Sequence, residues 1–436
     1  MSKINSGVVV FWFRRDLRLE DNAGLYHALK SGFPVLPLFI FDTDILAQLD
    51  NKADKRVDFI HQALWEMNVR LASMGSSICV KIGNPLPVFE QLTQEFDIKT
   101  VFTNRDYEPY ALKRDNSIEN LLSSKNIEFL TFKDQVIFEW NEVHKNDGKP
   151  YTVFTPYSKI WKQKLSDSVL QSYDSENERN YLQFSIQIPE LKDLGFIKTE
   201  LLFSTPVVDE TIIRNYDQQR NFPAIKGSTE LSVHLRFGTL SVRKLVRLAL
   251  KLNDAWLNEL IWREFFMSVI MHYPYVVNGP FKMKYDKIQW RNKEAEFVSW
   301  CEGKTGYPIV DAGMRQLNET GWMHNRVRMI VASFLTKHLL IDWRWGEAYF
   351  AQKLLDYDLS ANNGNWQWSA GCGCDAAPYF RVFNPDEQTR KFDSELIYIR
   401  RWVKEFDSLN YPLPIVDHVF ARNRALGVYK KGLNSL

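Results

Sequence analysis

The first 134 residues alternate short apolar runs with amphipathic stretches. The apolar runs lie at 8–13, 34–42, 77–83, 100–106 and 127–132. Between the second and third runs, residues 55–75 repeat apolar positions at the spacing of one helix face. Short apolar runs of this kind are typical of parallel strands that helices cover on both faces. The pattern predicts a doubly wound parallel sheet, a Rossmann-like α/β domain, over residues 1–134.

The hydrophobic pattern changes twice further along the chain. Residues 135–204 hold polar stretches without a sustained period, which indicates an interdomain connector. From about residue 205 the pattern is helical, with apolar positions at i, i+3, i+4 and i+7 in 254–273, 324–340 and 346–359. We therefore predict an all-helical domain over 205–436, which makes the fold class α/β plus all-α.

Length and composition narrow the class of protein. A chain of 436 residues suits two or three domains and is long enough to bury a large ligand. The apolar run before Arg14 is too short for a signal peptide or a membrane span, so we expect a cytoplasmic protein. Four cysteines fit a reducing compartment, and Cys372 and Cys374 lack the spacing of a zinc or redox motif. We expect no disulfide and no structural metal.

Charge and tryptophan are both unevenly distributed. Residues 1–200 contain 24 Lys and Arg against 28 Asp and Glu, whereas residues 201–436 contain 31 against 25. A basic excess in the second half suits solvated helices, and it also suits a phosphate-binding face. Ten of the 14 tryptophans follow residue 250. They serve either as core filler or, with polar neighbours, as the walls of a site for a cofactor and a stacked base.

One predicted helix places Glu259, Trp262 and Arg263 at i, i+3 and i+4, so that all three share a face. A carboxylate beside a large ring is suited to binding a heterocycle. The ordinary alternative is a surface ion pair next to a core tryptophan.

The next predicted helix gives the same spacing to Asn325, Arg328 and Met329, with Arg326 turned about 100° away. An amide, a guanidinium and a thioether on one face are unusual for a plain core, which favours a binding site.

The segment 362–368 reads NNGNWQW and is typical of a helix start, because Asn and Gly favour caps and the open amides there attract anions or electron-rich rings. Positions i and i+2 of a helix point about 200° apart. Trp366 and Trp368 must then serve different faces, so one packing role does not explain both.

No glycine-rich dinucleotide or phosphate motif follows the first strand, where residues 13–22 read FRRDLRLEDN. A hydroxyl-rich helix entry at 228–232, reading STELS, is an alternative place for a pyrophosphate, although a Ser or Thr cap is the commoner meaning of such a segment.

Together these segments resemble the photolyase/cryptochrome family, and within it a class I cyclobutane pyrimidine dimer (CPD) photolyase. The resemblance rests on long motifs in the family's order: 11–22, 231–241, 257–265, 303–317, 321–329, 358–368 and 375–385. It implies an α/β antenna domain and a helical domain that holds a U-shaped FAD, active as FADH⁻. The implied activity is light-driven repair of pyrimidine dimers in DNA by a monomeric enzyme.

The resemblance also implies which residues contact FAD. Segment 228–232 would hold the phosphates and ribose, Arg328 and Asp356 would pair beside the flavin, and Asn362 would face its N5. The full set of implied contacts is Tyr216, Ser228, Thr229, Glu230, Leu231, Ser232, Trp256, Glu259, Asn325, Arg328, Asp356, Tyr357, Asp358 and Asn362.

Three further groups follow from the resemblance. The catalytic group around the dimer comprises Glu259, Trp262, Asn325, Met329, Asn362 and Trp368. The DNA-binding group comprises Arg220, Trp262, Arg326 and Arg381. The electron relay from the surface to the flavin comprises Trp290, Trp343 and Trp366. Trp366 and Trp368, which a helix places on different faces, thus receive different roles.

Two rival functions share this fold and cofactor. A cryptochrome is a light-signalling receptor, and its plant-type members usually carry Asp where Asn362 stands. A six-four photolyase needs a histidine pair where Asn325 and Met329 stand. Both comparisons favour CPD repair.

The antenna chromophore stays open. Glu108 resembles the acidic residue that binds a folate antenna, whereas Val277 and Asn278 replace the preferred thiol and lysine. Methenyltetrahydrofolate, a deazaflavin, a second flavin and no antenna are the alternatives.

Overall fold

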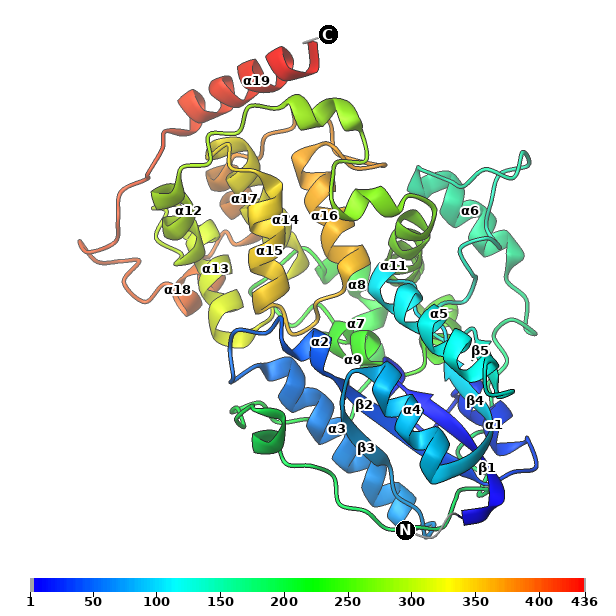
Figure 1. Ribbon diagram of the computed structural model, residues 1–436. Helices are drawn as coiled ribbons and strands as arrows, with labels where there is room; N and C mark the ends of the chain where they lie inside the picture. Colours follow the sequence, from blue (N-terminus) through cyan, green and yellow to red (C-terminus); the bar gives the residue numbers. More distant parts are fainter. Residues whose placement is uncertain (1–3, 435–436) are drawn as a thin grey trace. The chain divides into compact units, whose positions relative to one another are not determined.

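A five-stranded parallel sheet forms the N-terminal part of the chain in the computed structural model, which describes residues 4–434 (Figure 1). Its strand order is β3-β2-β1-β4-β5. The strands are β1 (Ile4–Phe13), β2 (Val35–Asp42), β3 (Cys79–Gly83), β4 (Phe96–Asn104) and β5 (Glu128–Phe132). The central strand β1 pairs Val9 with Val35 of β2 and Val10 with Val101 of β4, both in parallel. The predicted doubly wound sheet is confirmed.

Two compact units make up the structure, and each takes several stretches of the chain. The first unit contains the residues up to Glu142, Lys162–Val208 and Leu231–Lys251. The second unit contains Val143–Trp161, Asp209–Glu230 and the residues from Leu252 onward. The chain therefore passes from one unit to the other more than once.

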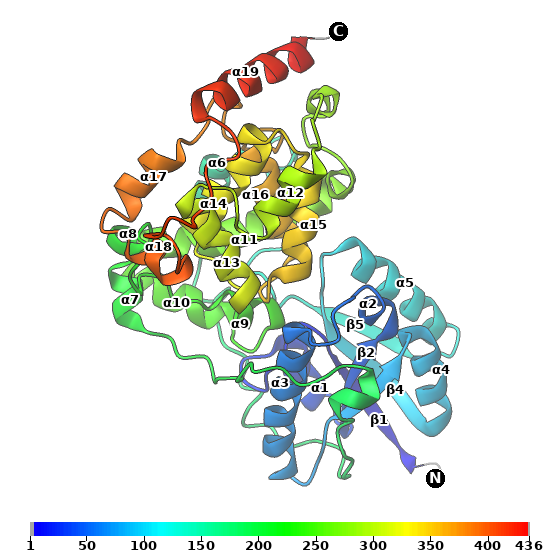
Figure 2. The same ribbon diagram turned by 90° about the vertical axis from the view of Figure 1, so that its left-hand side faces the viewer.

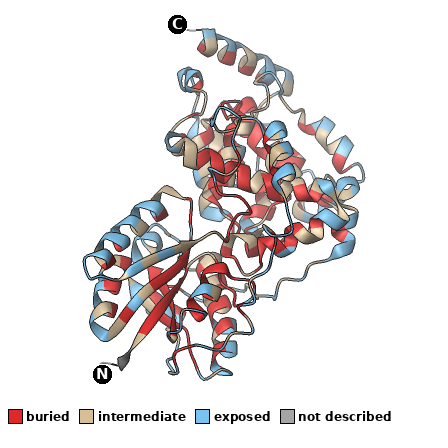
Figure 3. Cartoon of the chain, turned by 90° about the vertical axis from the view of Figure 1, so that its right-hand side faces the viewer, coloured by how far each residue is buried: buried red, intermediate tan, exposed pale blue. Residues whose placement is uncertain are grey.

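Helices and buried strands build the first unit. Its helices are α1 (Ala23–Leu29), α2 (Thr43–Leu46), α3 (Lys55–Ala72), α4 (Pro85–Glu95), α5 (Pro109–Ser123), α9 (Ser232–Phe237), α10 (Val242–Leu252) and the short η1 (Leu191–Leu194). The side chains of Asn22, Asp54 and Asn84 cap α1, α3 and α4 by accepting a backbone N–H of the first turn. Strand β2 is buried along its whole length, as a strand covered on both faces should be (Figure 3).

A buried ion-pair network holds residues 231–251 to the rest of the first unit. Asp134 accepts from Arg18 at 2.7 Å and from Arg243 at 2.8 Å, and all three side chains are at most 5% exposed. Burial opposes ionisation of this carboxyl, but the two guanidinium groups outweigh burial, so the pKa of Asp134 is lowered. The network joins residues that are far apart in sequence.

Helices dominate the second unit. They are α6 (Phe154–Lys164), α7 (Glu210–Arg214), α8 (Tyr216–Gln219), α11 (Asp254–His272), η2 (Pro274–Val277), η3 (Met283–Lys287), α12 (Glu294–Cys301), α13 (Pro308–Thr320), α14 (Asn325–Ser333), η4 (Phe334–His338), α15 (Trp343–Lys353), α16 (Leu359–Ala370), α17 (Pro385–Phe392), α18 (Ile397–Trp402) and α19 (His418–Asn434). Helix α6 begins inside the range predicted as connector. Helix α16 packs on α11, α14 and α15 (Figures 1 and 2).

The predicted helices at 254–273 and 324–340 are confirmed as α11 and as α14 continued by the π-helical turn η4. The third prediction, a helix over 346–359, is wrong beyond Lys353. There the backbone of Leu354 becomes extended, and Asp358 serves as the cap of α16. Residues 354–358 thus form a loop that carries two carboxylates. No helix within residues 4–434 has the length and apolar character needed to span a membrane.

Candidate functional site

Helix α16 starts earlier than the sequence indicated, and this fixes the geometry of the site. The predicted helix start at 362–368 is wrong: α16 begins at Leu359, and the side chain of Asp358 accepts the N–H of Ala361 at 3.1 Å. Asn362 and Gly364 lie inside the helix. Gly364 is suited there because Phe266 of α11 occupies the space where a Cβ would be. Side chains of 362–368 therefore project from a formed helix.

A cavity of about 100 Å³ opens in the second unit between α14, α16 and the loop that precedes α16. Helix α14 contributes three of the predicted site residues, the loop contributes two carboxylates, and α16 contributes an amide and two indoles. These lining residues are Asn325, Arg328, Met329, Asp356, Asp358, Asn362, Trp366 and Trp368. The structure thus brings together residues from two predicted groups, those around the flavin and those around the dimer.

Arg328 and Asp356 form an ion pair in the wall of this cavity. Nη2 of Arg328 lies 2.9 Å from Oδ2 of Asp356, and Nε donates to the carbonyl of Met323 at 2.7 Å. The second oxygen of Asp356, Oδ1, is buried without a hydrogen-bond partner among residues 4–434. A buried acceptor costs free energy when it is left unpaired, so a ligand N–H fits this position. An isoalloxazine ring carries such a donor, and the residues present fit a flavin.

Glu347 is a site neighbour that the sequence did not reveal. Asn362 donates to its carbonyl at 3.1 Å, and Asn363 donates to its carboxylate at 2.9 Å. Burial raises the pKa of Glu347 to about 7. The only sequence signal was its place four residues after Trp343, which puts the two side chains on one helix face.

Glu259 pairs with Arg220 rather than standing free on its helix. The two side chains approach to 2.5 Å, and each is between a third and two fifths exposed. Burial raises the pKa of Glu259, and Arg220 and Tyr216 lower it in part. The carboxyl group is therefore more easily protonated than that of an ordinary glutamate. A protonated carboxyl group both donates and accepts hydrogen bonds, which suits it to the edge of a base.

The predicted DNA-binding arginines lie within electrostatic reach of one another. Burial, Arg220 and Arg381 together lower the pKa of Arg326. Arg326 donates to Asn221 at 2.7 Å, and its guanidinium lies 4.4 Å from the ring of Phe392. Within residues 4–434, Arg220 has a carboxylate partner in Glu259, whereas Arg326 and Arg381 have none, which favours a phosphate ligand.

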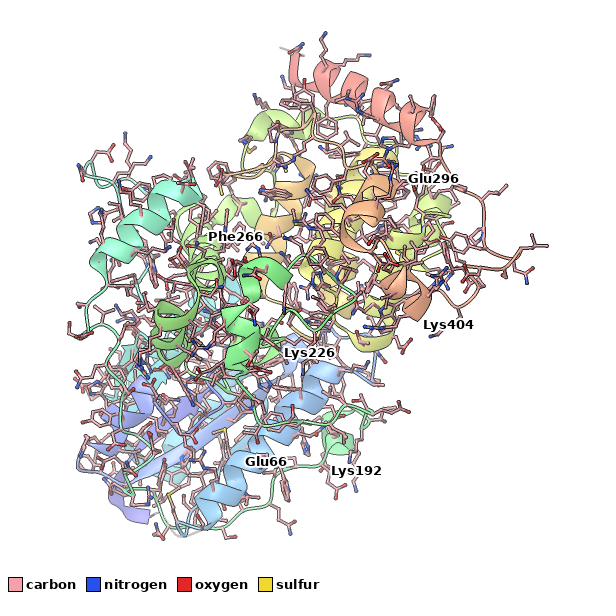
Figure 4. The ribbon with its side chains drawn as sticks, turned by 180° about the vertical axis from the view of Figure 1, so that it is seen from behind. Glu66, Lys192, Lys226, Phe266, Glu296 and Lys404 are labelled. Carbon is pink, nitrogen blue, oxygen red and sulfur yellow. The ribbon has the colours of Figure 1, made fainter. Side chains whose placement is uncertain are left out.

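The two predicted substrate tryptophans come from different helices. Trp368 of α16 lines the cavity. Trp262 of α11 lies in a cluster of rings with Phe154, Phe265 and Phe266. Phe266 in turn packs on α16 at Gly364, so the cluster links the helix of Trp262 to the helix of Trp368 (Figure 4).

The predicted relay tryptophans all belong to one apolar cluster. Trp366 and Trp343 are each 2% exposed, and Trp290 packs against the same cluster, half-buried. Trp366 meets Phe350 at 5.0 Å between ring centroids, whereas Trp290 meets Tyr429 at 5.8 Å. Trp366 belongs to the core and Trp368 does not, although both indoles line the cavity.

The predicted phosphate segment adopts an irregular helix entry. Glu230 has a φ of 54°, which few non-glycine residues adopt, and Ser232 begins α9. Ser228, Thr229 and Glu230 belong to the second unit, whereas Leu231 and Ser232 belong to the first. Trp256, another predicted FAD contact, is 5% exposed near the start of α11. Tyr357 lies half-buried in the loop before α16.

Glu108, the predicted antenna residue, already has charged partners in the first unit. Its carboxylate lies 2.8 Å from Arg15 and 2.9 Å from Arg236. A folate antenna at this carboxylate would have to share it with two guanidinium groups.

Comparison with known proteins identifies the family. Residues 9–175 match the family described as DNA photolyase, and residues 256–410 match the family described as the FAD binding domain of DNA photolyase. The chain belongs to the photolyase/cryptochrome family. One relative is the deoxyribodipyrimidine photo-lyase of Synechococcus, 36% identical over 97% of this chain and 96% of that protein.

Two solved structures agree with the fold. A bacterial class III photolyase from Agrobacterium tumefaciens superposes with a TM-score of 0.86 at 32% identity, over 99% of this chain and 98% of the other. An archaeal photolyase from Sulfolobus tokodaii, solved with two FAD molecules, superposes with a TM-score of 0.82 at 34% identity, over 97% and 99%. The predicted fold, family and FAD cofactor are confirmed. The assignment to class I stays a prediction.

Proposed function

We propose that this photolyase repairs cyclobutane pyrimidine dimers in DNA with the energy of blue light. The observation that carries the proposal is that the Arg328–Asp356 pair, Asn362 and Trp368 line one cavity. When bound, light-excited reduced FAD supplies an electron that opens the cyclobutane ring and then returns. The protein provides the place for both molecules and keeps water away from them.

Arg328, Asp356 and Asn362 are proposed to hold the flavin. The positive charge of Arg328 stabilises electron density on a neighbouring ring, and the unpaired Oδ1 of Asp356 accepts a ring N–H. The amide of Asn362 is held by Glu347, which fixes the direction of its side chain. Asp358 is occupied as the helix cap and contributes mainly by fixing where α16 starts.

Lesion recognition is proposed for Glu259, Trp262, Asn325, Met329 and Trp368. The two indoles offer flat surfaces for a dimer that leaves the base stack. Flipping costs a few kcal/mol and costs less at a damaged step that pairs poorly, so the pocket selects lesions over intact DNA. Glu259, whose pKa is raised by burial, is proposed to hydrogen-bond the pyrimidine edges.

Arg220, Arg326 and Arg381 are proposed to contact DNA phosphates. Binding should then weaken as salt rises, and replacing Arg326 with glutamine should reduce the slope of log K against log salt by about one. We also propose that the protein is a monomer in the cytoplasm and that residues 228–232 hold the FAD phosphates. Trp290, Trp343 and Trp366 are proposed as the electron relay, and the identity of the antenna stays open.

Blue-light irradiation of a thymine-dimer oligonucleotide with chemically reduced protein tests the proposal. We expect thymine to be regenerated in proportion to absorbed light, and no repair in the dark. Repair of a six-four lesion alone would replace the proposal with six-four photolyase activity. Flavin binding without repair of either lesion would favour a cryptochrome-type receptor.

A further inference from the structure

Phe154 stacks directly on Trp262. The two ring centroids lie 3.8 Å apart with an angle of 4° between the planes. Phe265 and Phe266 meet the same indole at 5.5 and 5.3 Å. Parallel contact at this distance covers one face of the indole, while Trp262 as a whole remains half-buried. The orientation of the indole is therefore set by a residue from a distant part of the sequence.

Helix α6, which Phe154 begins, is anchored at two further points in the second unit. The indole N–H of Trp161 donates to the buried carboxylate of Glu264 at 2.5 Å. Tyr157 packs against Phe265 at 5.1 Å. Both contacts reach α11 within one turn of Trp262, so α6 and the indole are held to the same stretch of helix.

A third anchor ties Phe154 to the segment that follows α16. The backbone N–H of Phe154 donates to Oδ2 of Asp375 at 2.9 Å. Trp368 lies near the end of α16, a few residues before Asp375. The ring of Phe154 thus contacts Trp262, one of the two proposed substrate tryptophans. Its backbone N–H contacts the segment that follows Trp368, the other one.

We propose that Phe154 is a positioning residue for lesion recognition, which fixes the plane of Trp262 so that the indole meets a dimer in one orientation. The inference rests on the proposed function, because it assigns Phe154 a part in selecting the same substrate. An indole already held in place loses less side-chain freedom when the lesion binds, and preorganisation of this kind improves affinity. Contacts between basic residues and phosphates do not depend on the indole, so affinity for undamaged DNA does not change.

Four variants test this inference: Phe154→Ala, Phe154→Leu, Phe154→Tyr and Asp375→Ala. Leucine keeps apolar volume without a flat ring, and tyrosine keeps the ring. Dissociation constants for a dimer oligonucleotide and for its undamaged twin are measured in the dark at equal FAD occupancy. Removing a stacked pair should weaken lesion binding about two- to tenfold for alanine and leucine. Tyrosine should restore native affinity, and Asp375→Ala should weaken lesion binding by a smaller factor.

A double-mutant cycle separates positioning from general stability. In a Trp262→Ala background, Phe154→Ala should have no further effect on lesion binding, because its target is gone. In Phe154→Ala, the lesion concentration that half-saturates repair should rise. Repair per absorbed photon at saturating lesion should stay within about twofold of the native value, and twofold is also the smallest loss of affinity expected for this variant.

Phe297→Ala is the matched control. Phe297 is also half-buried and stacks on a tryptophan, Trp300, at 5.8 Å, but away from Trp262. Phe297→Ala should leave the ratio of the dissociation constants for lesion and undamaged DNA unchanged. The inference is overturned if the Phe154 variants weaken both DNAs equally, leave both unchanged, or act equally with and without Trp262. If the native protein itself repairs no dimer and shows no lesion preference, the proposed function fails instead.

Discussion

Gly364 of α16 lies against the ring of Phe266 of α11, and replacing it with alanine tests that contact. A Cβ at this position would lie 2.1 Å from Cδ1 and 2.3 Å from Cε1 of Phe266. Both distances are far shorter than a van der Waals contact. Phe266 is 6% exposed and packs beside Trp262, so its ring has no open solvent to move into. The extra methyl group must push the two helices apart.

The expected magnitude follows from two opposing terms. Overpacking a filled interior costs about 1–3 kcal/mol, and a clash with one buried ring belongs at the upper end. Alanine gains about 1 kcal/mol over glycine in a helix interior. Gly364→Ala should therefore lower the free energy of unfolding by about 2 kcal/mol. Gly427 of α19 is the matched control, because a Cβ there meets nothing within 4 Å. The same exchange at 427 should stabilise by about 0.5–1 kcal/mol.

Urea unfolding followed by tryptophan fluorescence measures both variants against the native protein. FAD occupancy must be equal in all samples, because bound cofactor adds to apparent stability. Opposite signs for the two glycines support the close helix contact. If Gly364→Ala stabilises as much as Gly427→Ala does, the two helices do not approach as described and the argument is refuted.

Three further outcomes follow from other contacts. Arg243→Met should destabilise by about 3 kcal/mol in urea unfolding, because it leaves Asp134 buried with one partner fewer. Since the pKa of Asp134 is lowered, the stability it lends is present above its unfolded pKa of about 3.9 and is lost in acid. The deficit should shrink at low pH, and a deficit that stays constant would contradict this account. Glu347→Gln should flatten the dependence of the free energy of unfolding on pH between about pH 4.5 and 7. The raised pKa of Glu347 stabilises the fold fully at a pH below the pKa of the unfolded state, and this stabilisation is lost as pH rises through about 7. An unchanged slope would show that Glu347 is ionised throughout. Trp343→Phe should block photoreduction of oxidised flavin, followed by absorbance, yet spare repair by chemically reduced protein. Equal photoreduction in both proteins would exclude Trp343 from the relay.

Local sequence pattern predicted the elements well where each element is uniform. The hydrophobic patterns of buried parallel strands and amphipathic helices can be recognised without knowing which elements pack against them. The sheet and α11 were therefore predictable. The start of α16 was not, because Asn362 and Gly364 look like capping residues in isolation. Their place inside a helix depends on Phe266, which is distant in sequence.

The candidate site shows the same limit. Spacing brought Asn325, Arg328 and Met329 to one helix face, and all three line the cavity. Contacts between distant segments carried no sequence signal. The stack of Phe154 on Trp262 and the pairing of Arg220 with Glu259 depend on how whole helices pack. The side chains within one helix were predictable, whereas their partners from other helices were not.

The interleaving of the two units has a consequence for synthesis on the ribosome. Asp134 and Arg243 are 109 residues apart, yet they form one buried pair in the first unit. At about 5–20 residues per second, Arg243 is made roughly 5–20 s after Asp134. During that interval the nascent sheet carries a carboxylate whose second cation does not yet exist. The N-terminal region therefore matures late, and a ribosome that stalls before residue 243 leaves an incomplete domain exposed to chaperones and proteases.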